Sequence, residues 1–228
     1  DFLIGRDGAQ AFLLETAQDQ RDALLKRLTM YKLRAAVDLA VVEGSEVTVA
    51  WDGAEDGAPR DIRFAKAGLD VSRRARGGGA DDATLYDVLR ITAGLPEAGR
   101  DYALSDAFPH DVLLDLSGGV SFRTGCYVGQ EVVSRMHHRG TARRRPVVVK
   151  GKTPLPATGT ELLAGGKPIG TLGSVSGALG LAIVRIDRAG DAIRSGTPIT
   201  ADGAPVTVEL PGWTGLAFPD DASEVPAQ

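Results

Sequence analysis

The C-terminal half of the chain carries the pattern that most restricts its fold. Short β-prone segments follow one another after Arg145 and are separated by glycine and proline. They cover residues 147–149, 161–163, 167–172, 179–186 and 206–210. Short strands at this spacing are typical of a small barrel or sandwich. We therefore expect an all-β domain over 146–212, followed by a polar, proline-containing tail over 213–228.

The first 145 residues mix two periodicities and predict an α+β domain. Helical spacing relates Leu24, Leu25, Leu28 and Tyr31, and a second helical pattern ends near Gly94. A third helix is expected over 131–136. Strands are predicted over 2–4, 11–14, 37–42, 46–51 and 61–69.

Composition excludes several classes of protein. Of the 228 residues, 43% are hydrophobic, which is enough for a folded core, and the net charge of −4 argues against a general polyanion binder. The single cysteine excludes an intrachain disulfide and a zinc site built on several thiolates. Such cysteine usage favours a reducing compartment, and we predict a cytoplasmic protein. No apolar run reaches the roughly 20 residues that a membrane span needs, so no membrane partner is expected.

Several familiar sites are not supported. The run Gly151-Lys152-Thr153 looks like the end of a P-loop, but Pro146 occupies the position of the leading glycine. The three glycines at 77–79 are interpreted as a loop. The histidines His110, His137 and His138 do not predict a metal site, because only one thiol accompanies them and adjacent side chains point apart. A hydrolytic triad of Ser105, Asp106 and His110 lacks a nucleophile elbow.

Cys126 is the most informative single residue. It lies between Gly125 and Gly129, shortly before the helix expected at 131–136. The positive end of that helix, together with Arg123 and Arg135, favours the thiolate form. A lone thiol is more commonly buried and inert, and this alternative stays open. The two glycines favour a specified loop with close backbone approach.

A second local feature is basic. Residues 132–160 contain no acidic side chain. They contain Arg135, Arg139, Arg143, Arg144, Arg145, Lys150 and Lys152. This asymmetry would suit an anionic ligand, such as a glutamate tail or a phosphate backbone. Pairing with acidic neighbours in the fold is an equally good interpretation.

The segment around Cys126 resembles the signature of the YgfZ family. The family motif reads Lys-Gly-Cys-Tyr-x-Gly-Gln-Glu, and residues 125–131 here read Gly-Cys-Tyr-Val-Gly-Gln-Glu, with Thr124 in place of the lysine. Residues 132–136 and 138–140 resemble its continuation. Further upstream, Arg90-Ile91, Gly94 and Pro96 are similar to another family element, as are residues 28–34.

This resemblance implies a fold like that of the glycine cleavage aminomethyltransferase: a folate-binding α+β body followed by a small C-terminal β-barrel. It also implies that the body begins before Asp1. Cys126 is the implied functional thiol, in a loop formed with Gly125, Tyr127, Gly129, Gln130 and Glu131. Tetrahydrofolate is the implied ligand, with Arg90, Tyr127, Arg135 and Arg139 as the expected binding residues. No metal ligands are expected.

The implied function is accessory rather than conventionally enzymatic. We expect a tetrahydrofolate-binding protein that supports assembly or repair of iron–sulfur clusters in client enzymes, including tRNA-modifying ones. Its expected partners are folate, client enzymes or assembly proteins, and tRNA. One alternative is an aminomethyltransferase, a tetrahydrofolate-dependent one-carbon transferase. That enzyme carries a glutamate where Thr92 stands and lacks the cysteine loop. Another alternative is an RNA-binding module that uses the basic stretch at 135–152.

Overall fold

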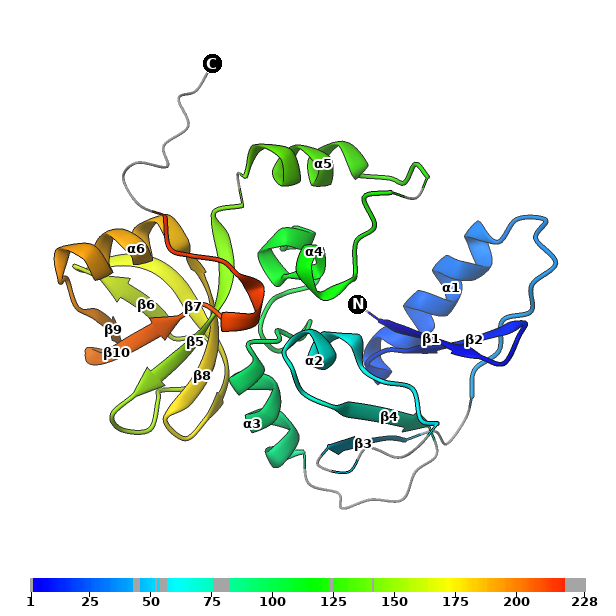
Figure 1. The fold of residues 1–228 in the computed structure, drawn as a ribbon, viewed down its shortest axis with the longest axis horizontal. Coiled ribbons are helices and arrows are strands. Elements are labelled where there is room, and N and C mark those ends of the chain that lie inside the picture. The colour runs from blue at the N-terminus through cyan, green and yellow to red at the C-terminus, as the bar shows by residue number, and fades with distance from the viewer. Residues whose placement is uncertain are drawn as a thin grey trace.

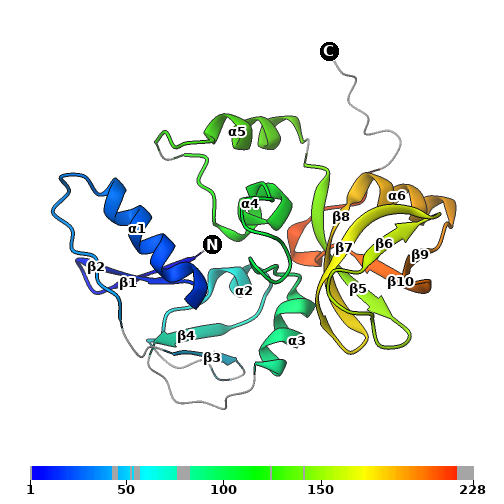
Figure 2. The same cartoon turned by 180° about the vertical axis from the view of Figure 1, so that it is seen from behind.

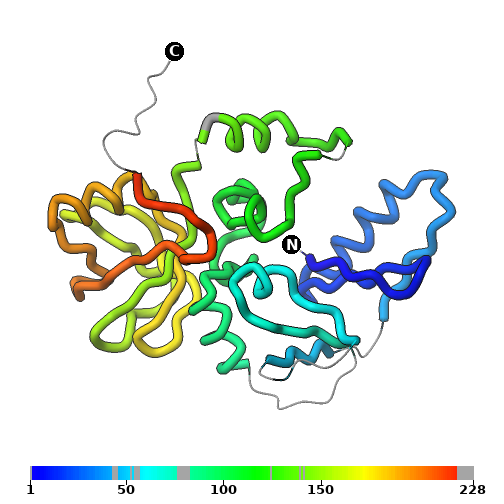
Figure 3. Tube along the Cα trace, in the orientation of Figure 1, coloured from blue at the N-terminus to red at the C-terminus, as the bar shows by residue number. Residues whose placement is uncertain are grey.

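A computed structural model describes residues 2–42, 46–51, 53, 57–75, 83–123, 125–140 and 142–219. Figures 1 and 2 show a β-barrel at one end of the molecule and an N-terminal hairpin with its helix at the other, with the remaining elements between them. The tube in Figure 3 follows the chain from the hairpin through the central elements into the barrel. The mixed α/β character and the C-terminal barrel agree with the sequence prediction.

The N-terminal hairpin pairs β1 (Leu3–Asp7) with β2 (Ala11–Glu15) in an antiparallel register. The turn contains Gly8 with a φ of +68°, and Arg6 lies over the Phe12 ring at 4.9 Å from its centroid. A short 3-10 turn, η1 (Gln18–Gln20), leads into α1 (Arg21–Tyr31), in which no residue is buried. The two strands and the helix predicted for this region are therefore confirmed.

Residues 37–42 do not form the predicted strand. They lie outside the strands of the structure and are mostly exposed, and the Lys32 ammonium donates to the Val37 carbonyl at 2.7 Å. Strand propensity reflects how well side chains fit a pleated, half-buried surface, and most side chains of this segment are exposed to solvent instead. The prediction was wrong for that reason. The glycines at 77–79 lie outside the described residues.

A second hairpin and two helices form the centre of the body. Strands β3 (Val47–Trp51) and β4 (Val71–Ala75) pair antiparallel. Phe64, Val71, Ala93 and Leu95 form a small core between the hairpin and the helices α2 (Ile62–Lys66) and α3 (Thr84–Ala93). Gly94 ends α3 in the left-handed region with a φ of +69°, as predicted.

The strand predicted over 61–69 is wrong, because this segment contains α2. Asp61 is the N-cap, and its carboxylate accepts a hydrogen bond from the Arg63 amide at 3.0 Å. Phe64 is completely buried, and Gly68, with a φ of +79°, ends the turn. The cap and the buried phenyl ring decide the local structure more strongly than the apolar alternation of the segment.

Three short helical elements connect the centre to the barrel. They are η2 (Pro109–Val112), α4 (Leu114–Ser117) and α5 (Gln130–Arg139). Figure 1 shows α5 above α4, set apart from the layers below it. The helix predicted at 131–136 is thus confirmed and is longer at both ends. Its isolated position places the loop that precedes it at the surface of the molecule.

Six antiparallel strands close the C-terminal barrel in the order β10-β5-β8-β7-β6-β9. Their bounds are β5 (Arg144–Gly151), β6 (Glu161–Ala164), β7 (Lys167–Ser176), β8 (Leu179–Arg185), β9 (Ile199–Ala201) and β10 (Ala204–Glu209). Apolar side chains such as Val147, Val149 and Leu162 fill its interior. Each predicted β segment overlaps one of these strands, although 179–186 and 206–210 each run one residue past the end of β8 and β10, and β9 was not predicted.

Helix α6 (Ile186–Ser195), also not predicted, packs against the barrel with Ile186, Ala189 and Ala192 buried. The segment expected to be a tail is packed where it begins. The Trp213 indole, in η3 (Gly212–Thr214), donates to the Ala93 carbonyl at 2.8 Å, and Phe218 lies against the barrel core. The last described residues therefore tie the barrel to α3.

Candidate functional site

Two glycines shape the loop that carries Cys126. Gly125 has a φ of +47° and Gly129 a φ of +88°, and Gly129 is the N-cap of α5. Both lie in the left-handed region, which favours glycine. A Cβ at either position would meet nothing within 4 Å. Among the described residues, nothing therefore approaches either glycine as closely as expected. They are required for the direction that the backbone takes.

The thiol of Cys126 is exposed. The alternative of a buried cysteine is therefore wrong, and the reactivity of the thiol stays a prediction. Its neighbours are exposed as well: Tyr127 is partly exposed and Val128 is fully so. Phe122 and Val132 add further exposed apolar surface on either side of the loop. A thiol in apolar, accessible surroundings can be reached by a large partner, and it is not enclosed in a pocket of its own.

The loop leads directly into α5. The Gln130 amide donates to the Tyr127 carbonyl at 3.2 Å, and the Gly129 carbonyl accepts from the amides of Val132 and Val133. The Glu131 carboxylate forms an ion pair with Arg135 at 2.5 Å, one turn further along the helix. Gln130 and Glu131 therefore lie in the first turn of α5, and Glu131 neutralises part of the Arg135 charge.

An aromatic cluster lies beneath α5. The Phe122 ring stacks on His137 with 4.0 Å between ring centroids, and His110 lies 6.3 Å from Phe122 and 6.5 Å from His137. His110 is buried, and burial lowers its pKa. Among the described residues no group of three or more histidine, cysteine, aspartate or glutamate side chains could hold a metal ion.

Arg90 is completely buried at the junction between body and barrel. Its guanidinium donates to the Leu95 carbonyl at 2.9 Å, to Asp101 at 2.5 Å and to the Ser174 hydroxyl of β7 at 2.5 Å. Asp101 also accepts from the Ser174 amide at 2.7 Å. Arg90 thus connects α3 to the barrel. Its expected role in folate binding stays a prediction, and its Nη1 and Nη2 donors are bonded to protein atoms in this structure.

The basic stretch is largely neutralised by acidic neighbours. Arg145 forms a buried, two-pronged pair with Asp115 at 2.9 and 3.0 Å. Arg135 pairs with Glu131, Lys150 with Glu209 at 2.6 Å, and Arg144 more distantly with Asp106 at 4.0 Å. Of the six basic side chains that the structure describes in this stretch, four therefore have acidic partners. This favours the interpretation that the basic stretch pairs with acidic neighbours in the fold over the interpretation that it forms an open site for an anionic ligand.

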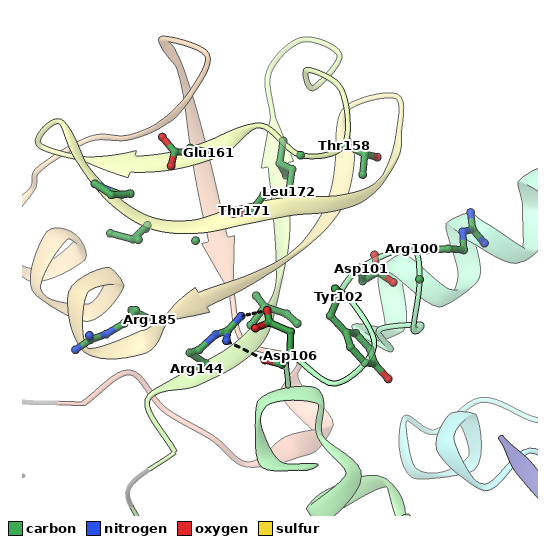
Figure 4. A pocket seen from close by; sticks show the side chains of 17 residues that line it. Arg100, Asp101, Tyr102, Asp106, Arg144, Thr158, Glu161, Thr171, Leu172 and Arg185 are labelled. Carbon is green, nitrogen blue, oxygen red and sulfur yellow. Dashed lines mark hydrogen bonds and ion pairs between the residues drawn. The ribbon is translucent and has the colours of Figure 1, made fainter. Parts of the chain in front are cut away.

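An open cavity of about 560 Å³ lies between residues 99–106 and the outer face of the barrel. Figure 4 shows Arg144 and Arg185 on one side, Tyr102 and Asp106 on another, and Glu161 and Thr171 across the opening. Arg185 is held by Asp187 at 2.5 Å, whereas Arg144 makes only long contacts to Asp106. Arg144 is therefore the cation of this wall with the weakest protein partner.

The four residues expected to bind folate do not line this cavity. Arg90 is buried in the junction, while Tyr127 and Arg135 lie exposed on the Cys126 loop and α5. The side chain of Arg139 lies outside the described part of the chain. Sequence reasoning named Arg144 as part of the basic stretch but missed Glu161 and Arg185, because these residues come from separate strands and share no local motif with it.

Comparison of the sequence with models of known families also finds a barrel in the C-terminal half of the chain. Residues 143–216 match the family model of the CAF17 C-terminal beta-barrel domain. The CAF17-type barrel thus covers all six strands described above. Over most of its length, body and barrel together, the chain is similar in sequence to proteins named as iron–sulfur cluster assembly factors of the IBA57 type.

Three relatives illustrate this similarity. The mouse "Iron-sulfur cluster assembly factor IBA57, mitochondrial" is 32% identical over 206 residues, covering 78% of this chain and 58% of the relative. The human protein of the same name is 32% identical over 199 residues, 76% of this chain and 56% of the relative. The homologue from Coccidioides immitis is 30% identical over 171 residues, 64% of this chain and 40% of the relative.

The chain therefore spans less than two thirds of the length of each of these relatives. Their names place them in mitochondria, and the cytoplasmic location expected for this chain stays a prediction. No helix among the described residues is long and apolar enough to cross a membrane.

Proposed function

We propose that this chain is an accessory factor in iron–sulfur cluster assembly, and that Cys126 is the group it presents to a partner protein. The exposure of Cys126 is the observation that carries the proposal. The similarity to IBA57-type factors supplies the process in which the thiol acts. The client enzymes, with tRNA-modifying enzymes among them, are part of the same proposal.

The surroundings of the thiol favour a protein partner. Tyr127 and Val128 extend into solvent beside Cys126, and Phe122 lies at the base of the loop. Exposed apolar side chains that cluster around a functional group are typical of protein–protein contact. We therefore propose that the loop docks on a client enzyme or an assembly protein, with the thiol at the centre of the contact.

One thiolate limits what the chain can do with a cluster. Iron–sulfur clusters are held by several cysteine ligands, and this chain has a single cysteine. Cys126 can contribute one ligand while a partner supplies the others, and the cluster is then cargo that passes between proteins. Alternatively, the Cys126 thiolate can attack a disulfide of the partner, which forms a mixed disulfide and releases the partner's second sulfur as a thiol.

The test measures the activity of iron–sulfur enzymes under oxidative stress, in cells that depend on this protein. One set of cells carries Cys126→Ala and the other carries the control Lys152→Ala. Lys152 is an exposed residue beyond the end of β5. We expect a loss of activity with Cys126→Ala only. Full activity of the Cys126→Ala cells would remove the thiol from the function.

We further propose that tetrahydrofolate binds in the cavity beside the barrel. A volume of about 560 Å³ lies within the usual range of about 300–1,000 Å³ for small-molecule sites. The ion pair between Arg144 and Asp106 is long, at 4.0 Å, so the Arg144 guanidinium can exchange it for a carboxylate of the folate glutamate. Ile169 and Ile183 line part of the wall with apolar surface. When bound, the folate would supply one-carbon chemistry.

This second proposal is tested by thermal unfolding with and without tetrahydrofolate. At a ligand concentration of about 100 times Kd, binding to the folded state stabilises it by about 2.7 kcal/mol. We expect this stabilisation in the wild type and in Lys150→Ala, and a smaller one in Arg144→Ala. If tetrahydrofolate stabilised both variants equally, the binding site would not involve Arg144. If it did not stabilise the wild type, the proposal of a folate site would be wrong.

The other candidates receive less support. An aminomethyltransferase would need the glutamate that Thr92 replaces. An RNA-binding module, or direct tRNA contact, would need the basic stretch to be free, and four of its side chains pair with carboxylates. A salt-sensitive complex with tRNA, lost in the double variant Arg143→Glu and Arg144→Glu, would restore that candidate.

A further inference from the structure

His110 is unusual among the buried polar residues of the body. Its side chain is 2% exposed, and neither ring nitrogen has a hydrogen-bond partner among the described residues. The nearest carboxylate oxygen, Oδ2 of Asp115, lies 3.9 Å from Nε2, beyond hydrogen-bond distance. A buried polar group without a partner costs free energy and calls for an explanation.

The cover over His110 is thin. Phe122 and His137 stack on each other and both lie over the His110 ring. Phe122 and His137 are themselves exposed on their outer side. Only one layer of aromatic rings therefore separates His110 from solvent in this direction.

This cover also holds the Cys126 loop. Phe122 precedes the loop and His137 follows it in α5, so their stack closes the base of the segment that carries the thiol. Val133, one turn before His137, is buried on the same face of the helix. The helix packs against η2, the element that contains His110. The packing of α5 on η2 and the closure of the Cys126 loop at its base therefore depend on the same side chains.

The charges around His110 oppose a second positive charge. Arg145 lies on one side and already pairs with Asp115, while His137 lies above. Asp111, in η2 itself, is buried and accepts from the Phe108 amide at 3.3 Å. Burial lowers the pKa of His110, the Asp115 and Asp111 carboxylates raise it in part, and Arg145 and His137 lower it further.

We propose that His110, Phe122 and His137 form a proton-operated latch, in which neutral His110 keeps α5 and the Cys126 loop seated on η2. When a proton binds a ring nitrogen of His110, the imidazolium needs hydration that the closed cover denies. The Phe122–His137 stack then lifts, and the loop becomes mobile. The consequence for the partner rests on the proposed function of Cys126, whereas the latch itself does not.

The single cysteine makes the latch measurable. A nitroxide spin label attached to Cys126 of the full chain reports the mobility of the loop alone. We expect a slow, ordered spectrum at pH 8 and a mobile one at pH 5, with a midpoint below about 6.5, the ordinary value for histidine. A spectrum that does not change between pH 8 and pH 5 would overturn the latch.

Variants identify the group that titrates. His110→Phe should remove the pH response, while His137→Phe, which keeps an aromatic ring in the stack, and His138→Phe should both retain it. Persistence of the response in His110→Phe, or its loss in His137→Phe alone, would overturn the role of His110. Phe122→Ala should give a mobile label already at pH 8, and Phe122→Tyr should not.

A measurement on the unaltered side chains covers the case in which His110→Phe does not fold. The His110 ring resonance of the wild type should titrate together with the mobility of the label. A His110 that stays neutral while the label becomes mobile would overturn the proposal. No cluster or client enzyme enters these experiments, so failure of the latch is separate from failure of the assembly function.

Discussion

Arg90 and Asp101 face each other at the junction of body and barrel, with 2.5 Å between Nη1 and Oδ2 and only 1% of either side chain exposed. Asp101 also accepts from the amides of Glu97 and Ser174, at 2.8 and 2.7 Å. The pair therefore connects α3, the loop that follows it and strand β7. Removing Arg90 leaves Asp101 as a buried charge without this counterion.

We expect Arg90→Ala to lower the free energy of unfolding by about 3–5 kcal/mol, because Asp101 would stay buried and uncompensated. Urea unfolding followed by circular dichroism measures the change. The matched control is Arg100→Ala, which removes an exposed pair with Asp87 at 2.6 Å and should cost at most about 1 kcal/mol. Similar losses in both variants would contradict the structural role of the buried pair.

Gly173→Ala should destabilise the contact between the body and the barrel, because the added methyl group would clash with Asp101. A Cβ at this position would lie 2.5 Å from Asp101 Oδ1 and 2.8 Å from Asp101 Cα, so a backbone atom would have to move. Overpacking of this kind costs typically about 1–3 kcal/mol. Gly5→Ala, where a Cβ meets nothing within 4 Å, is the control in thermal unfolding. An unchanged Tm for Gly173→Ala would argue against this approach.

Asp61 should make folding sensitive to acid. Burial alone would raise the pKa of Asp61, but hydrogen bonds and charges from Arg63 and Arg73 outweigh it and lower the pKa overall. The unfolded chain then binds a proton more readily than the folded one. The stabilisation is complete above the unfolded value of about 3.9 and is lost as the pH falls through the folded value.

The measurement is the difference in unfolding free energy between the wild type and Asp61→Asn from pH 7 to pH 2. We expect it to be constant above about pH 5 and to shrink below about pH 4. Asp70→Asn, which removes an exposed pair with Arg60, serves as the comparison and should show little effect. A difference independent of pH would show that the Asp61 charge contributes nothing.

Gly129→Val should loosen the start of α5. The φ of +88° is strained for a β-branched residue and costs about 1–2 kcal/mol, although no atom lies near enough to clash. Hydrogen exchange at the amides of Val132 and Val133, which donate to the Gly129 carbonyl, should accelerate. Gly129→Asn should be milder, because asparagine tolerates this region. Equal protection in all three proteins would contradict the strain argument.

Much of the barrel could be predicted from local sequence. Residues 147–149 form a continuous β-branched run, all three of them buried, and glycine and proline separate the strands. Strand β9 and helix α6 were missed. Only Ile199 and Ala201 of β9 are deeply buried, and α6 begins immediately after β8, so its apolar start was interpreted as the end of that strand.

The Cys126 loop shows where local information ends. The two glycines indicated a specified loop before a helix, and both have the positive φ that glycine permits. Whether the thiol is buried depends on what packs over the loop, which local sequence does not contain. The structure leaves it exposed, and the same tertiary packing places Phe122 and His137 over His110.

The sequence by itself determined where the chain turns from mixed α/β to all-β, where α3 ends and where the thiol lies. These features depend on periodicity and on glycine, which act over a few residues. Tertiary structure alone decided the partners of the charges: Arg90 meets Ser174 and Arg145 meets Asp115 across long stretches of chain. Burial makes such pairs strong, and burial is a property of the folded whole.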